Sequence, residues 1–366
     1  MSLSVDIKKK FSGFNLDVNF EVENETLGLL GASGCGKSLT LRCIAGIETP
    51  DEGKIVVNDR VFFEREANKK PIVNLTPQQR KTALLFQNYM LFPNLTIEQN
   101  ISAGIDRDKS SDEVSKIVET QLKKFGLVGM EKRYPAQLSG GQQQRVAIAR
   151  MLAAQPQILM LDEPFSALDS HLKGALEQHL SVVFSEFEGS ILYVSHDIDE
   201  ALRLSDRIAV VDAGHIMEMC EKRQLVDDPK SLAGLKLSGC KNTTKAFKIE
   251  KNKMRLPEWG IEVATENEVP DDIKHFGVRA FMIDKVDGDG ENCYLTRVVH
   301  KTESRFENAL MLQFVGSQND EEIRDNLDKC LYWRVDTLKY ADDQIPNVGD
   351  EVWVKIPKDK IYMVTK

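Results

Sequence analysis

Apolar and polar residues alternate along the start of the chain and then give way to a mostly apolar stretch. Val5 to Leu30 has the pattern of strands, and its last part, Thr26 to Leu30, is the apolar stretch. A glycine-rich loop follows, and Ser38 to Ala45 then has helical spacing. A buried strand, a glycine-rich loop and a helix, in this order, form the local structure in which phosphate-binding loops occur.

Beyond this start, helical and strand-like segments indicate an α/β core. Two segments with helical spacing, Ser111 to Phe125 and Gly140 to Ala154, predict a mostly helical subdomain at about 88–154. Three short apolar runs then have the composition of parallel strands that are buried on both faces. These runs are Ile158 to Leu161, Ile191 to Val194 and Ile208 to Val211. We therefore expect an α/β core that is interrupted by the helical subdomain.

The sequence pattern changes after about residue 235. Residues 236–244 are polar and contain glycine, as a linker does. Short alternating segments follow and predict an all-β module, most simply a barrel of the OB type. These segments are Gly277 to Ile283, Cys293 to Val299, Ala309 to Val315, Leu331 to Val335 and Glu351 to Ile356. The predicted domains are therefore 1–235, a linker at 236–244, and 245–366.

Charge and composition exclude several classes of protein. The 57 acidic and 48 basic residues give a net charge of −9, which argues against nucleic acid as a partner, because such proteins need a basic face. No apolar run reaches the roughly 18–20 residues that cross a bilayer, so we expect any role at a membrane to come through a partner. The six cysteines contain no C-x-x-C pair and indicate reduced thiols.

The loop at 31–38, GASGCGKS, fits the phosphate-binding pattern G-x-x-x-x-G-K-[ST]. Its glycines let the backbone curl with the N–H groups inward, toward a β-phosphate. Lys37 adds a charge for the β- and γ-phosphates, and the hydroxyl of Ser38 suits Mg²⁺. The expected nucleotide-binding residues of this loop are Gly31, Ala32, Ser33, Gly34, Cys35, Gly36, Lys37 and Ser38.

Two carboxylates follow the apolar run that ends at Leu161. Asp162 is placed to hold Mg²⁺, and Glu163 is placed to polarise the attacking water. Taken alone, Asp-Glu-Pro would simply start a turn, and the phosphate-binding loop is what favours the catalytic interpretation.

A second glycine-rich string, LSGGQQQR at 138–145, opens a predicted helix. Unpaired N–H groups and the positive end of the helix dipole make such a start an anion site. Its expected nucleotide contacts are Ser139, Gly140, Gly141 and Gln142. One chain with two phosphate-binding segments indicates a nucleotide held between two copies of the protein.

Three further residues are candidates for the same site. Gln87 follows an apolar strand, so its amide suits contact with the metal and the attacking water, and the apolar loop tip after it, Tyr89 to Phe92, suits a docking surface. His196 follows another strand and suits a γ-phosphate. Asp169 lies in Ser166 to Asp169, where the chain is expected to cross toward a second subunit.

Taken in order, these segments resemble the ATPase subunit of ATP-binding-cassette (ABC) transporters over about residues 1–235. The resemblance implies an α/β P-loop NTPase fold, with a RecA-like core and the helical subdomain. It also implies ATP and Mg²⁺ as ligands, with Mg²⁺ held by Ser38, Gln87 and Asp162. It also implies Glu163 as catalytic base, His196 as switch histidine, and a homodimer in which the 138–145 string of one subunit closes over the phosphate loop of the other. The family stacks an aromatic ring on adenine, and Phe11 and Phe14 are both candidates, with Phe11 taken here.

The segment EPFSALDSHLK and the β module resemble an importer subgroup whose C-terminal extension is a TOBE-type OB barrel. Within this subgroup the sequence most resembles the molybdate and sulfate importers. This resemblance implies a peripheral subunit at the cytoplasmic face of the membrane, bound to permease subunits and indirectly to an extracytoplasmic solute-binding protein. Iron, polyamines and sugars stay open as solutes, and so does a regulatory oxyanion in the barrel. A soluble ABC ATPase without a permease is the alternative class.

Overall fold

The computed structural model describes residues 2–11, 13–86, 88–106, 108–166, 170–304, 307–316, 329–336, 340 and 344–366, apart from the side chains of residues 170–172 and 175. The chain forms two compact units, Met1–Lys222 and Arg223–Lys366. The segment 236–244 lies within the second unit, where it contains the end of α9 (Leu232–Leu237) and most of β12 (Asn242–Lys245). Among the described helices, none combines the length and the apolar character that crossing a membrane requires.

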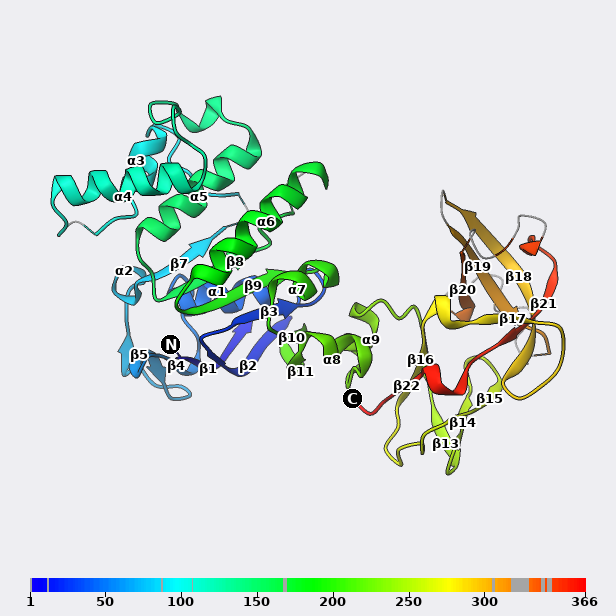
Figure 1. The fold of residues 1–366 in the computed structure, drawn as a ribbon. Helices are drawn as coiled ribbons and strands as arrows, with labels where there is room; N and C mark the ends of the chain where they lie inside the picture. Colours follow the sequence, from blue (N-terminus) through cyan, green and yellow to red (C-terminus); the bar gives the residue numbers. More distant parts are fainter. Residues whose placement is uncertain are drawn as a thin grey trace. The chain divides into compact units, whose positions relative to one another are not determined.

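One mixed sheet forms the body of the first unit (Figure 1). Its strands β10, β3, β9, β8 and β7 run parallel, and the strands from β6 to β2 pair antiparallel. In spatial order the strands are β6 (Val73–Asn74), β5 (Arg60–Arg65), β4 (Glu52–Val57), β1 (Ser2–Phe11), β2 (Phe14–Glu23), β11 (His215–Glu221), β10 (Arg207–Asp212), β3 (Thr26–Leu30), β9 (Ser190–Ser195), β8 (Ile158–Asp162) and β7 (Thr82–Leu85).

The parallel strands bring distant parts of the sequence to one edge of the sheet. Every residue of β3, β8 and β9 is buried, which explains why these strands are continuous apolar runs. In the register of the sheet, Leu30 lies opposite Ser195, and Asp162 lies opposite Val194. The residues that follow these strands therefore meet at their carboxyl ends, where ligands bind in open α/β sheets.

Three helices of the first unit form a separate group. These helices, α3, α4 and α5, pack on one another in the region predicted to be helical, and α5 also contacts β7 (Figure 1). Each of these three begins with a capping box, in which Thr96, Ser110 or Ser139 bonds a Gln or Glu three residues later. The helices are α1 (Lys37–Ala45), α2 (Pro77–Arg80), α3 (Ile97–Ser102), α4 (Ser111–Lys124), η1 (Pro135–Gln137), α5 (Gly140–Ala153), α6 (Ser170–Glu186) and α7 (Ile198–Leu204).

The second unit is all-β apart from short helices, consistent with an OB-type domain. Its described strands form the sheets β12-β16-β22, β13-β14-β15 and β17-β21-β18-β19-β20, and most of its buried apolar residues belong to one cluster. Besides β12, α9 and α8 (Lys222–Asp227), which joins the two units, its elements are β13 (Phe247–Glu250), β14 (Lys253–Leu256), β15 (Ile261–Ala264), β16 (His275–Val278), η2 (Ala280–Met282), β17 (Asp284–Val286), β18 (Cys293–Glu303), β19 (Glu307–Phe314), β20 (Leu331–Asp336), β21 (Glu351–Lys355), η5 (Lys358–Lys360) and β22 (Ile361–Val364). The single strand expected over Gly277 to Ile283 is wrong, because η2 interrupts it.

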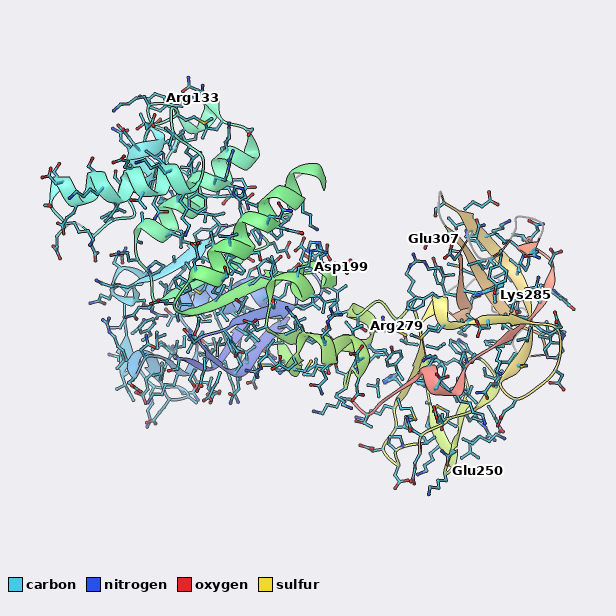
Figure 2. The ribbon with its side chains drawn as sticks, viewed as in Figure 1. Arg133, Asp199, Glu250, Arg279, Lys285 and Glu307 are labelled. Atoms are coloured by element: carbon cyan, nitrogen blue, oxygen red, sulfur yellow. The ribbon has the colours of Figure 1, made fainter. Side chains whose placement is uncertain are left out.

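A buried arginine organises the start of the second unit. Arg279, labelled in Figure 2, is 6% exposed. Its guanidinium donates to the carbonyl oxygens of Val226 and Ser238, near the ends of α8 and α9, and to the hydroxyl of Tyr362. Carbonyls at helix C-termini carry partial negative charge, so they stabilise this cation.

Candidate active site

The loop between β3 and α1 has the backbone conformation that its glycines permit. Gly34 and Gly36 have φ values of 82° and 109°, in the left-handed region. Gly31 is required for a different reason, because a Cβ at this position would lie 2.2 Å from the carbonyl oxygen of Val211 at the end of β10. Gly214, in the turn after β10, donates its N–H to the carbonyl oxygen of Cys35 at 3.0 Å. The loop is therefore fixed from outside by the neighbouring strand.

Lys37 begins α1 and is buried beneath the loop, with 4% of its surface exposed. Its Nζ donates to the carbonyl oxygens of Gly31 at 2.8 Å and of Ala32 at 2.9 Å. Sγ of Cys35 lies 3.8 Å from the same ammonium group. Among the described residues, no carboxylate forms an ion pair with this buried ammonium, so it suits an anion bound by the loop.

Ser38 and Asp162 join the loop to the end of β8. The hydroxyl of Ser38 donates to Oδ1 of Asp162 at 2.6 Å. Burial raises the pKa of Asp162, and the hydrogen bond from Ser38 opposes that rise. Hydroxyl and carboxylate oxygens are ligands that Mg²⁺ prefers, and a Mg²⁺ that binds with a nucleotide needs only one or two protein carboxylates. This pair therefore fits such an ion, whereas no group of three or more His, Cys, Asp or Glu side chains among the described residues is placed to hold a metal alone.

Glu163 and His196 face each other at the carboxyl ends of β8 and β9. Oε2 of Glu163 lies 3.3 Å from Nδ1 of His196. Glu163 has a φ of 45°, which is unusual for a residue with a side chain, and its N–H donates to the carbonyl oxygen of Val194 at 3.1 Å. The side chain of His196 is 58% exposed and that of Glu163 is 19% exposed, so the pair opens toward solvent.

A polar network that the sequence did not reveal holds the loop around His196. Oε2 of the buried Glu200 accepts from the hydroxyls of Tyr193 and Ser195, each at 2.6 Å. Lys173 on α6 donates to the other oxygen of Glu200 at 2.6 Å and to Asp197 at 2.9 Å. The residues on both sides of His196 are therefore anchored to α6.

A pocket of about 480 Å³ lies at the glycine loop and reaches Asp162 and Glu163, while His196 is not part of its lining. Its wall contains part of the glycine loop, both carboxylates after β8, and the two aromatic candidates, whose ring centroids are 6.5 Å apart. Phe11 is 42% exposed and Phe14 packs near Gly36, so both rings remain candidates for a nucleobase. The lining residues are Phe11, Phe14, Ser33, Gly34, Gly36, Lys37, Ser38, Leu39, Arg42, Glu48, Asp162 and Glu163; Leu39, Arg42 and Glu48 were not predicted.

The chain is similar to the ATP-binding proteins of bacterial importers. A family model described as ABC transporter matches residues 15–166. The sulfate/thiosulfate import ATP-binding protein CysA of Brucella melitensis is 34% identical over 325 residues, and the alignment covers 87% of each chain. The chain belongs to the ABC transporter family.

Other relatives in this family are named for different solutes. The Fe(3+) ions import ATP-binding protein FbpC of Haemophilus influenzae is 41% identical over 226 residues, which are 61% of this chain and 62% of that protein. The spermidine/putrescine import ATP-binding protein PotA of Vibrio cholerae is 37% identical over 275 residues, which are 74% of this chain and 70% of that protein. The match to the iron-import relative thus spans less than two thirds of that protein's length.

A solved ABC structure has the same fold as the first unit. It is the dimeric post-hydrolysis state of the ATP-binding cassette MJ0796 bound to ADP and Pi, with a TM-score of 0.51 and 30% identity. The match covers 61% of this chain and 99% of that one. The P-loop NTPase fold predicted from the sequence is therefore confirmed.

The segment that resembles the ABC signature lies away from the pocket lining. Ser139 caps α5, with its hydroxyl accepting from the N–H of Gln142 and the side chain of Gln142 accepting from the N–H of Ser139. Ser139 and Gly140 are exposed, and a Cβ at Gly140 or Gly141 would meet no atom within 4 Å. The structure therefore does not bring these four residues to the phosphate loop of their own chain, and it leaves the start of α5 open. Gln87 and Asp169 lie outside the described residues.

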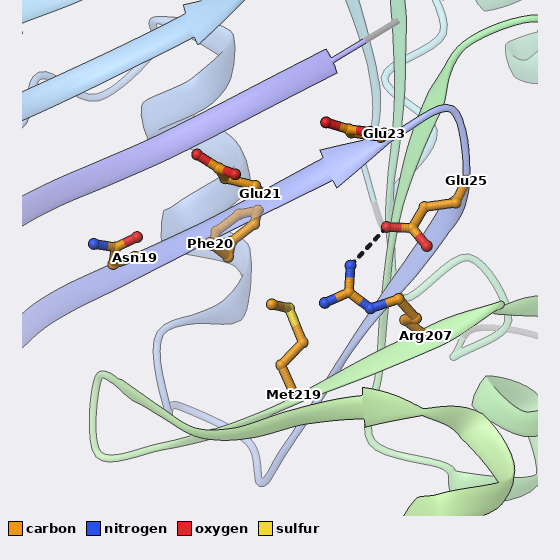
Figure 3. A pocket seen from close by; sticks show the side chains of 7 residues that line it. All are labelled: Asn19, Phe20, Glu21, Glu23, Glu25, Arg207 and Met219. Carbon is orange, nitrogen blue, oxygen red and sulfur yellow. Dashed lines mark hydrogen bonds and ion pairs between the residues drawn. The ribbon is translucent and has the colours of Figure 1, made fainter.

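A second pocket borders β2 and β11, apart from the phosphate loop (Figure 3). Three glutamates, Glu21, Glu23 and Glu25, contribute to its wall, and Glu25 pairs with Arg207 at 2.9 Å. Such an acidic lining does not suit a nucleotide phosphate, so the pocket at the glycine loop is the candidate active site of this ABC protein.

Proposed function

We propose that the chain is the ATP-hydrolysing subunit of an ABC importer. One observation carries this proposal: the carboxyl ends of three adjacent parallel strands bring Lys37, Ser38, Asp162, Glu163 and His196 to one edge of the sheet. These are a cradle for phosphates, a pair of metal-binding oxygens, a carboxylate and an imidazole, which together are the groups that phosphoryl transfer to water requires.

The predicted site residues have distinct roles in the proposal. The loop from Gly31 to Gly36 holds the β-phosphate by its N–H groups, and Lys37 binds the β- and γ-phosphates. Glu163 accepts a proton from the attacking water, and His196 hydrogen-bonds the γ-phosphate. Phe11 or Phe14 stacks on the adenine. Mg²⁺, held by Ser38, Asp162 and Gln87, would neutralise charge on the phosphates when it is bound.

Two copies of the chain complete each ATP site. The start of α5 is an exposed helix N-terminus that its own pocket does not use, and the N-terminus of a helix attracts anions. We therefore infer that Ser139, Gly140, Gly141 and Gln142 of one copy bind the γ-phosphate held by the other, with Asp169 near the same interface. The dimeric state of the similar MJ0796 cassette supports this arrangement.

The solute is proposed to be an oxyanion, such as sulfate, molybdate or tungstate. The alignment with the sulfate/thiosulfate import protein supports this choice because it includes most of the second unit, whereas the iron-import alignment covers only 61% of the chain. Iron and polyamines remain the alternatives that the names of the other relatives supply. In this proposal the chain sits at the cytoplasmic face of the membrane, bound to permease subunits that receive solute from a solute-binding protein.

Reconstitution tests the proposal directly. The full chain would be purified with its permease, inserted in liposomes and supplied with MgATP and the solute-binding protein. Uptake of labelled sulfate or molybdate that stops in the Glu163→Gln variant would support the oxyanion assignment. Uptake of Fe³⁺ or spermidine in place of the oxyanions would overturn that assignment, and ATP-independent uptake would overturn the importer ATPase role. Titration of the same full chain with molybdate would test the regulatory oxyanion.

A further inference from the structure

Gln144 on α5 connects two parts of the first unit that lie far apart in sequence. It is fully buried, with 0% of its surface exposed. Its Nε2 donates to the carbonyl oxygen of Pro164 at 2.6 Å. Its Oε1 accepts from the hydroxyl of Tyr89 at 3.2 Å. One amide group thus joins the turn that follows the catalytic candidate Glu163 to the loop that follows Gln87.

The backbone is strained at both ends of this connection. Glu163, which precedes Pro164, has a φ of 45°. At the other end, Tyr89 and Met90 have φ values of 59° and 45°, so two consecutive residues with side chains are left-handed. Such conformations persist only where the surrounding contacts enforce them, and they cluster at switch regions. Gln144 supplies one such contact at each end.

Arg150, six residues after Gln144 on α5, holds the main chain at the Tyr89 end of this connection. Its guanidinium donates to the carbonyl oxygen of Tyr89 at 2.9 Å and to that of Met90 at 2.8 Å. The same group lies 5.2 Å from the centre of the Phe92 ring. Tyr89 is therefore fixed at its side chain by Gln144 and at its main chain by Arg150, both from one helix.

The loop held in this way carries an exposed apolar tip. Met90 is 52% exposed and Phe92 is 48% exposed, whereas Tyr89, which directly precedes Met90, is buried. Exposed apolar side chains on a loop with a fixed backbone suit contact with another protein. In the proposed importer, this tip is where a permease helix would bind.

We propose that Gln144 is a positioning residue that couples permease contact at Met90 and Phe92 to the placement of Glu163. Displacement of the Tyr89–Met90 turn moves the Tyr89 hydroxyl, and the Gln144 amide transmits this displacement to the Pro164 carbonyl. Because Pro164 follows Glu163 directly, the displacement changes the direction of the Glu163 carboxylate relative to His196. This inference rests on the proposed function, since it requires a permease and ATP turnover.

The test compares permease-stimulated with basal ATP turnover of the full chain. Gln144→Met removes both hydrogen bonds at nearly constant volume, and Tyr89→Phe removes a single hydroxyl, so the second variant tests the connection even where the first folds poorly. Gln121→Met is the matched control: it changes a glutamine of α4, in the same helical subdomain, whose Oε1 has no hydrogen-bond partner among the residues that the structure describes. Each variant and the double variant Tyr89→Phe/Gln144→Met would be assayed with MgATP, alone and in complex with the copurified permease.

We expect Gln144→Met and Tyr89→Phe to lower the ratio of stimulated to basal kcat by about fivefold or more, with KM for MgATP changed by less than about twofold. The double variant should be no worse than Gln144→Met alone, because both substitutions interrupt one connection. Unchanged ratios in both single variants, additive losses in the double variant, or an equal loss in Gln121→Met would overturn the inference alone. Absence of any stimulated turnover in the parent chain would overturn the proposed function and the inference with it.

Discussion

Ser38 Oγ donates a 2.6 Å hydrogen bond to Oδ1 of Asp162, although the two residues are 124 positions apart in the chain. The bond joins the start of the phosphate-loop helix to the end of β8. Asp162 is 7% exposed, so its carboxylate depends on this donor in the absence of other ligands. The relationship places a hydroxyl and a carboxylate side by side where a nucleotide's metal would bind.

Ser38→Ala should therefore impair both stability and nucleotide binding. Removal of a hydrogen bond to a buried carboxylate should lower the free energy of unfolding by roughly 1–3 kcal/mol, and KM for MgATP should rise at least about tenfold. Urea unfolding without nucleotide and steady-state kinetics measure the two effects. Thr40→Val is the control, because it removes from the same helix a hydroxyl that donates to the carbonyl oxygen of Gly36. An equal rise of KM in Thr40→Val would contradict the role given to Ser38.

Gly141→Asp should affect stability and nucleotide-driven dimerisation in opposite directions. Gly141 lies in the first turn of α5 with open space for a side chain, and a carboxylate there should stabilise the helix by about 0.3–1 kcal/mol. The same charge should repel a γ-phosphate presented by a second copy and weaken dimerisation more than about tenfold. Thermal unfolding and sedimentation with ATP measure these effects. Gly141→Asn is the neutral control, and equal dimerisation of the Asp and Asn variants would refute the phosphate contact.

Gly214→Ala should disturb the phosphate loop from outside the pocket. Gly214 has a φ of 86°, and a Cβ there would lie 1.9 Å from the carbonyl oxygen of Asn15, so the turn must move. Since its N–H donates to Cys35, we expect a loss of roughly 2–3 kcal/mol of stability together with weaker ATP binding. Gly129→Ala is the matched control, with a φ of 84° and no atom within 4 Å of the new Cβ. Its cost should be about 1 kcal/mol with unchanged ATP affinity, measured by calorimetry. Equal effects of the two variants would argue against the clash.

Asp197→Asn should give a stability difference that depends on pH. Burial raises the pKa of Asp197, but hydrogen bonds from Lys173 and from the N–H groups of Glu200 and Asp199 outweigh burial and hold the pKa below its usual range. A carboxylate with a lowered folded-state pKa contributes stability that is present above its unfolded pKa of about 3.9 and is lost as pH falls through the folded value. The free energy of unfolding of the parent should therefore exceed that of Asp197→Asn by up to about 1 kcal/mol at neutral pH. This difference should vanish in acid.

Urea unfolding over a pH series measures this difference. Asp199→Asn, which changes an exposed carboxylate in the same turn, is the control. A parent-to-variant difference that stays constant from about pH 7 to about pH 3 would contradict the ion pair with Lys173.

Most of the residues that line the candidate site were predicted from the sequence, for a physical reason. Phosphate binding by backbone N–H groups needs glycines at fixed positions between a strand and a helix, so Gly31 to Ser38 leaves a readable pattern. Asp162 and His196 were predicted from a different pattern, because each comes at or after the end of a short apolar strand. Because parallel strands end at the same edge of a sheet, the strand pattern alone predicts that these residues lie close together.

The supporting groups could not be predicted, because their partners are set by packing. Gln144 lies in the 138–145 string and Arg150 lies further along the same helix, but the string does not indicate their contacts with the Tyr89–Met90 turn and Pro164. Arg80 has 0% of its surface exposed, and its guanidinium donates to the carbonyl oxygens of Cys43 and Ile44 at the end of α1. Burial lowers the pKa of Arg80 to about 10. No local pattern marks an arginine whose partners are helix carbonyls.

Small strands of the second unit were also missed. The segments β13, β14 and β15 have only four residues each, and exposed residues such as Phe247 break the alternation of apolar and polar positions. Alternation identifies a strand only where one face is buried throughout, so the longer strands β18 and β19 were recognised and these were not.

The central claim is that one ATP is held by two copies of this chain, and Glu163→Gln tests it most directly. This variant should bind MgATP but not hydrolyse it, so the closed dimer should accumulate. Sedimentation of the full-length variant, with its permease present, would be measured without nucleotide, with MgADP and with saturating MgATP. The account predicts ATPase subunits that associate in pairs only with MgATP, with one nucleotide bound per chain. Subunits that stay unpaired when saturated with MgATP would contradict it.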